Sequence, residues 1–182
     1  MRHISRRYVS TSLLVAVLVF TTACDSSILT AFRSGFAASK PFIQTLVDTN
    51  TIPQTAATLA IADVDDGIAA LTTGDRCLKA ITEEGSAKKL AKAKCYYAAA
   101  QSLRTILDRH HFESHETLNR ISTIVSGAIA ALEEYYRSVS GPIARSATVG
   151  KKSAEDAAEK VLKEKMEKAK KEMQDLKHDL ER

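Results

Sequence analysis

Apolar residues recur at intervals of three and four positions along most of the chain from residue 28 onward. Ile61, Val64 and Ile68 illustrate the spacing, which places their side chains on one face of an α-helix. Comparable stripes cover residues 28–47, 57–81, 87–109 and 114–138, and no long stretch alternates with period two. The pattern therefore predicts an all-α protein, an antiparallel bundle of about four helices over residues 24–138.

Proline and glycine mark the expected interruptions of these helices. Pro41 lies within the first stripe and predicts a kink or a restart capped by Ser39. Gly85 predicts a tight turn between the second and third helices. The apolar periodicity also predicts that Tyr97 and Tyr136 face the core.

A different pattern begins after residues 139–153, which we interpret as a linker because Gly141, Pro142 and Gly150 lie in it without any clear periodicity. Residues 154–182 are rich in Lys, Glu, Ala, Leu and Met and predict a charged helix. Its apolar residues follow 4-3-4-3-4 spacing, a heptad pattern that we call the apolar seam. The apolar seam consists of Leu162, Met166, Ala169, Met173, Leu176 and Leu180.

Three uses of this charged helix are compatible with the pattern: self-association, docking on another protein, or a solvated helix that extends from the bundle. Residues 151–182 carry 10 basic and 9 acidic side chains. That balance disfavours a helix lying on a membrane surface, since such helices are usually cationic.

The amino-terminal 23 residues have the features of a secretory signal peptide. Arg2, Arg6 and Arg7 precede the apolar run of residues 13–20, which is too short to span a bilayer comfortably. Small residues then follow the run. We therefore expect residues 1–23 to be removed.

The end of this segment, Thr21-Thr22-Ala23-Cys24, resembles the lipobox of bacterial lipoproteins, although those usually have leucine where this chain has Thr21. The resemblance implies that Cys24 is acylated and holds the mature chain on a membrane of the cell envelope, facing the periplasm or the exterior. The alternative is ordinary cleavage after Ala23, with Cys24 as an unmodified residue.

Charge changes the picture once the signal peptide is set aside. The chain has a formal net charge of +4, but the first 23 residues contribute three arginines and no acid. The remainder has 23 basic and 22 acidic residues, so a nucleic-acid partner is not expected.

Cys77 and Cys95 flank the turn at Gly85 and would lie opposite each other in an antiparallel helical hairpin. With Cys24 acylated they form an even pair, which predicts a structural disulfide in an oxidising compartment.

The segment DRHHFESHE, residues 108–116, offers the only candidate metal ligands. His111 and His115 would share a helical face and Asp108 would add a carboxylate, a set suited to zinc, copper or nickel. The alternative is an exposed loop in which Ser114 caps the fourth helix. Acidic residues 63–66 are interpreted as a solvated helix face.

No phosphate-binding loop or nucleophile motif is present, so neither an enzyme nor a cofactor is expected. The sequence favours a membrane-anchored envelope lipoprotein with a non-enzymatic interaction or scaffolding role, in which the C-terminal helix binds a partner or self-associates. The alternative is a small-ligand or metal-binding protein that uses the bundle interior or residues 110–116.

Overall fold

The computed structural model of the chain describes residues 27–141 and 151–178. The signal peptide, Cys24 and Leu180 lie outside this range. The described residues form five α-helices and one short 3-10 helix, with no strand, which confirms the predicted all-α fold. The helices are α2 (Ser27–Asp48), α3 (Gln54–Lys79), α4 (Gly85–Leu107), η1 (His111–Ser114), α5 (Glu116–Ser140) and α7 (Lys151–His178).

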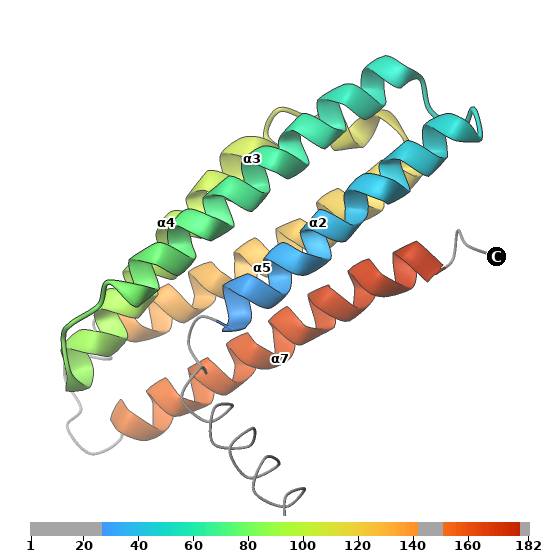
Figure 1. Ribbon diagram of the computed structural model, residues 1–182. Coiled ribbons are helices and arrows are strands. Elements are labelled where there is room, and N and C mark those ends of the chain that lie inside the picture. Colours follow the sequence, from blue (N-terminus) through green and yellow to red (C-terminus); the bar gives the residue numbers. More distant parts are fainter. Residues whose placement is uncertain (1–26, 142–150, 179–182) are drawn as a thin grey trace, which may run out of the picture.

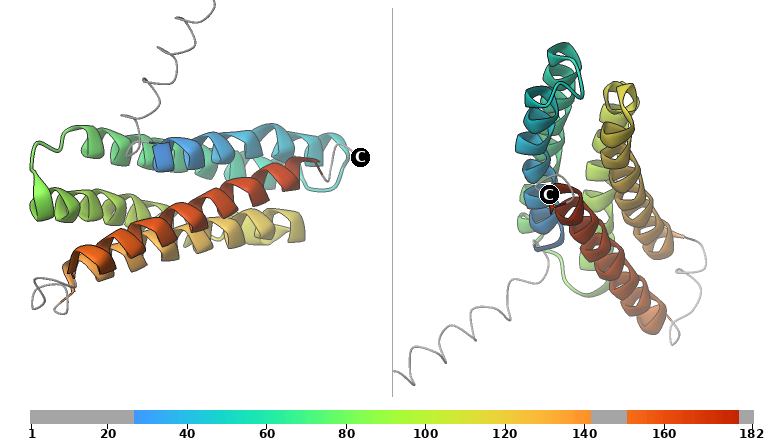
Figure 2. Two further views of the ribbon diagram at one scale, coloured as in Figure 1. Left: turned by 90° about the horizontal axis from the view of Figure 1, so that it is seen from below. Right: turned by 90° about the vertical axis from the view of Figure 1, so that its right-hand side faces the viewer.

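Each helix packs against the next along the chain, and α7 closes the ring by packing against both α5 and α2 (Figure 1). Successive helices run antiparallel, so α7 and α2 run in the same direction. Figure 2 shows α7 alongside these two neighbours from two further directions. None of the described helices is both long enough and apolar enough to cross a membrane.

The interior is built from medium-sized apolar side chains with phenylalanines on α2. Phe32 and Phe36 are fully buried and their rings stack with centroids 6.2 Å apart. Phe36 packs against Gly67 of α3 so closely that an added Cβ there would lie 2.0 Å from the ring. Gly67 is therefore a point of close helix contact, which glycine allows because it has no side chain.

The turn between α3 and α4 follows the prediction. Gly85 has φ +60°, a left-handed conformation that glycine adopts without strain, and α4 begins there. A disulfide joins Cys77 to Cys95 across the turn with a Cα–Cα distance of 5.7 Å. The predicted pairing is confirmed.

Pro41 does not end α2, so the expected restart of the helix is wrong. The helix is continuous from Ser27 to Asp48 with Pro41 inside it. Phe42 and Ile43, directly after the proline, are both buried in the core, and the Ser39 hydroxyl donates to the carbonyl of Phe36 at 2.6 Å instead of capping a new helix. Packing on both sides of the proline outweighs the lost backbone hydrogen bond.

Candidate functional site

The apolar seam lies against the bundle of the same chain. Five of its residues are on described parts of α7 and are between 1% and 7% exposed: Leu162, Met166, Ala169, Met173 and Leu176. On α2, a Cβ added to Gly35 would stand 3.7 Å from the Cβ of Met173, so the two helices approach closely there. The seam thus completes the bundle core.

Two ion pairs between elements also hold α7 in place. Lys165 donates to Glu134 of α5 at 2.5 Å, and Lys89 of α4 donates to Asp156 at 2.8 Å. The bond from Lys165 lowers the pKa of Glu134 below its ordinary value. The stabilisation of the folded state by this ion pair is therefore fully present above the ordinary glutamate pKa, and it is lost as the pH falls through the lowered pKa of Glu134.

These contacts revise the expectation that the charged helix stands apart from the bundle and offers its seam to another molecule. A heptad pattern specifies an apolar face but not the surface that covers it. In the folded chain α2 and α5 cover that face.

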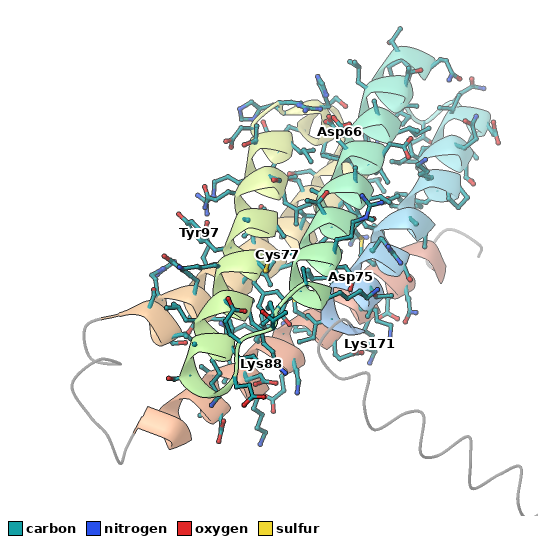
Figure 3. All side chains as sticks on the ribbon, turned by 60° about the vertical axis from the view of Figure 1, so that its left-hand side comes forward. Asp66, Asp75, Cys77, Lys88, Tyr97 and Lys171 are labelled. Carbon is teal, nitrogen blue, oxygen red and sulfur yellow. A yellow bond between two sulfur atoms is a disulfide. The ribbon has the colours of Figure 1, made fainter. Side chains whose placement is uncertain are left out.

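A different surface, on α4 and α5, has the residue types that dominate protein interfaces. Tyr97 and Tyr136 stack with ring centroids 4.4 Å apart and an interplanar angle of 23°. Tyr97 is 37% exposed and lies on the outer side of α4, away from the bundle interior (Figure 3). Tyrosine and arginine are enriched among residues that contribute most to protein–protein binding.

Polar side chains surround the two rings in a fixed arrangement centred on Glu133 of α5. Its Oε1 accepts from Gln101 at 3.0 Å and from Arg104 at 2.8 Å, and Arg137 lies 3.6 Å from its Oε2. Glu133 is only 12% exposed, whereas Arg104 and Arg137 are 51% and 72% exposed. The carboxylate thus orients both guanidinium groups while leaving them accessible.

We call this surface the tyrosine face. It forms a shallow groove of about 360 Å³ lined by Tyr97, Gln101, Arg104, Glu133, Tyr136 and Arg137. The aromatic rings lose little side-chain entropy on binding, and each arginine can donate two hydrogen bonds to a carboxylate. The arrangement suits a protein partner with acidic residues at its contact surface.

A second polar cluster joins α3 to the segment before α5. Asp63 is 1% exposed and accepts from Arg109 at 2.9 Å and from His111 Nδ1 at 2.8 Å. Asp66 also accepts from Arg109 at 2.6 Å, and these two acids raise the pKa of Arg109, Asp66 having the larger effect. The expected solvated acidic face is therefore wrong for Asp63, which is a buried structural acceptor.

Asp63→Ala is expected to lower the free energy of unfolding by about 2 kcal/mol, because it removes two hydrogen bonds to charged or polar donors from a buried site. Asp65→Ala is the matched control, since Asp65 is 56% exposed and pairs with Lys40 at the surface. Its expected change is within about 0.5 kcal/mol. Urea unfolding measures both, and equal changes would contradict the structural role of Asp63.

The three proposed metal ligands do not converge. His111 lies in η1 and bonds to Asp63. His115 has an extended backbone and caps α5, where its Nδ1 accepts from the Thr117 N–H at 3.2 Å. Asp108 is the residue directly after α4. The helical face predicted for His111 and His115 is absent because the chain between them forms a 3-10 turn and then an extended residue. Across residues 27–141 and 151–178, no group of three or more His, Cys, Asp or Glu side chains is placed to hold a metal ion.

Comparison with protein-family models, curated proteins and solved structures finds no match to the chain.

Sequence reasoning missed the tyrosine face because it placed Tyr97 in the core, whereas Tyr97 is exposed. Tyr136, also predicted to face the core, is partly buried and packs against it. The preceding tyrosine of each pair lies deeper in the bundle. Tyr96 and Tyr135 are 3% and 2% exposed, and their rings meet edge to face with centroids 5.6 Å apart. A signal existed, since Ala93, Tyr96, Ala100 and Leu103 follow 3-4-3 spacing once alanine is counted as a core residue.

Proposed function

We propose that the protein is a lipid-anchored envelope protein with a non-enzymatic binding role, and that it binds a protein partner through the tyrosine face. The lipobox-like Thr21-Thr22-Ala23-Cys24 supports the anchor. The observation that carries the binding role is the stacking of the exposed Tyr97 on the partly buried Tyr136, beside arginines that Glu133 holds in position.

This assignment moves the interaction surface from the apolar seam to α4 and α5. Deleting residues 154–182 would expose the core of the bundle, so that deletion could not separate lost binding from lost folding. Substitutions on the tyrosine face avoid the difficulty because Tyr97 and both arginines are substantially exposed.

Photo-crosslinking in intact cells tests the binding role. A photoreactive phenylalanine analogue at Tyr97 keeps an aromatic ring in place, and the same analogue at Leu59, which is 47% exposed on α3, is the matched control. We expect a discrete crosslinked product from Tyr97 and none from Leu59. Arg104→Ala with Arg137→Ala should reduce the yield at least about tenfold, the loss typical of residues that dominate an interface.

The mass of the product identifies the partner. A second protein supports the proposal, whereas a product of two copies of this chain indicates self-association through the same face. If Tyr97 and Leu59 gave the same products, or none, the tyrosine face would not be the binding site. Mass measurement of the peptide beginning at Cys24 tests the anchor separately, since an unmodified cysteine contradicts acylation.

A further inference from the structure

The turn between α3 and α4 and the helix ends beside it carry a net positive charge. Residues 75–94, which include the end of α3, the turn and the start of α4, carry six basic and three acidic side chains, a net charge of +3. The rest of residues 24–182 carries 17 basic and 19 acidic side chains, a net charge of −2. We call this end the basic tip; its cations are Arg76, Lys79, Lys88, Lys89, Lys92 and Lys94.

Acidic side chains pair with two of the cations of the basic tip. Asp75 bonds to Lys79 at 2.7 Å, and Asp156 of α7 bonds to Lys89 at 2.8 Å. Arg76, Lys88 and Lys94 are all exposed to solvent. The tip therefore presents several cations outward.

Acidic residues gather toward the opposite end of the bundle, where Arg109 and Lys40 pair with three of them. Asp63, Asp65 and Asp66 lie in the first half of α3, and the segment between α4 and α5 adds Asp108 and Glu113. Figure 3 shows Asp66 and Lys88 toward opposite ends of the molecule. The charge separation therefore follows the long axis of the bundle.

The first turn of α2 lies on the half of the bundle that carries the basic tip. A Cβ added to Gly74, five residues before the end of α3, would stand 2.8 Å from Leu29 of α2. Figure 1 shows the start of α2 and the α3–α4 turn toward the same end.

The covalent path from the proposed anchor to the bundle is very short. Cys24 lies three residues before Ser27, where α2 begins, and three residues span roughly 10 Å at most. An acyl chain on Cys24 thus holds the first turn of α2 close to the headgroups. A bundle tethered so closely must set part of its surface against the membrane.

We infer that the basic tip contacts the negatively charged headgroups of the membrane that holds Cys24. This inference rests on the lipid anchor in the proposed function. Anionic lipids attract lysine and arginine at the surface, and each basic residue near it strengthens the contact by a factor of roughly five. The contact would orient the bundle with its acidic end away from the membrane.

Lysine acetylation on vesicles tests the inference. The protein purified from its native membrane is reconstituted in phosphatidylcholine vesicles and in vesicles that also contain phosphatidylglycerol, and the reaction rate of each lysine is followed by mass spectrometry. Lys88 should react roughly five times more slowly in the anionic vesicles at low salt. Lys40, near the acidic end, should react equally in both.

Two matched variants show whether the charge of the tip is responsible. Arg76→Gln with Lys94→Gln should abolish the slowing at Lys88. Arg120→Gln with Lys171→Gln, which removes the same charge from α5 and from the far half of α7, should preserve it. Equal rates at Lys88 in both vesicle types, or loss of slowing in both variants, would overturn the inference.

The peptides analysed by mass spectrometry also include the one that begins at Cys24, and its mass shows whether Cys24 is acylated. The experiment therefore distinguishes failure of the anchor from failure of the headgroup contact. An acylated Cys24 with unslowed Lys88 leaves the anchor and refutes the headgroup contact. An unmodified Cys24 with slowed Lys88 refutes the anchor and supports the contact.

Discussion

Leu162→Ala is expected to lower the free energy of unfolding by about 3 kcal/mol. Leu162 is 1% exposed in the interface of α7 with the bundle, and truncation there removes buried apolar surface and leaves a cavity. Urea unfolding followed by circular dichroism measures the loss. The value tests whether α7 belongs to the cooperative core.

Val161→Ala provides the control because Val161 is the preceding residue on the same helix and is 40% exposed. Its effect should stay within about 0.5 kcal/mol. Similar small effects at both positions would mean that α7 does not dock on the bundle in solution.

Cys77→Ala with Cys95→Ala is expected to cost about 3 kcal/mol. The disulfide closes a loop with a sequence separation of 18, and the chain-entropy model assigns about that stabilisation to a loop of this length. Alanine is used because Cys95 is 3% exposed and serine would place a hydroxyl in the core.

Reductant supplies the control for the disulfide. The wild-type protein in excess dithiothreitol should unfold at nearly the urea concentration of the double variant, and the variant itself should not respond to reductant. A wild-type midpoint that is insensitive to reductant would contradict a stabilising disulfide.

The helices could be predicted from sequence because their signal is local. Intervals of three and four identify the apolar face of each helix without knowledge of its neighbours. The disulfide was predictable for a related reason: Cys77 and Cys95 flank a single turn marked by Gly85, so a short-range hairpin brings them together.

The adjacent tyrosines Tyr96-Tyr97 and Tyr135-Tyr136 show how a helical pattern can be correct while the wrong one of two neighbouring residues is assigned to the core. Adjacent residues on a helix point about 100° apart, so the two tyrosines of a doublet cannot both lie at the centre of the buried face. Tyr135 continues the stripe of Ala128 and Leu132, and all three are buried. Counting alanine as a core residue would have placed Tyr135 at the centre of the stripe and Tyr136 at its edge, where it is partly buried.

Long-range contacts were not predictable. Asp63 bonds to Arg109 and His111, which lie 46 and 48 residues farther along the chain. Apart from its four-residue spacing from Gly67, nothing in the local sequence distinguishes it from its exposed neighbours Asp65 and Asp66. The partner of the apolar seam is likewise set by the ring of helices. Gly67 directly follows the acidic residues 63–66 in the sequence, and it packs tightly against Phe36 of α2.

Because α2 and α7 run in the same direction, the start of α2 and the end of α7 lie toward opposite ends of the bundle (Figure 1). At a rise of 1.5 Å per residue, the 28 residues of α7 extend about 42 Å. If the first turn of α2 is held at a bilayer, as proposed above, the bundle spaces the last turn of α7 away from the lipid.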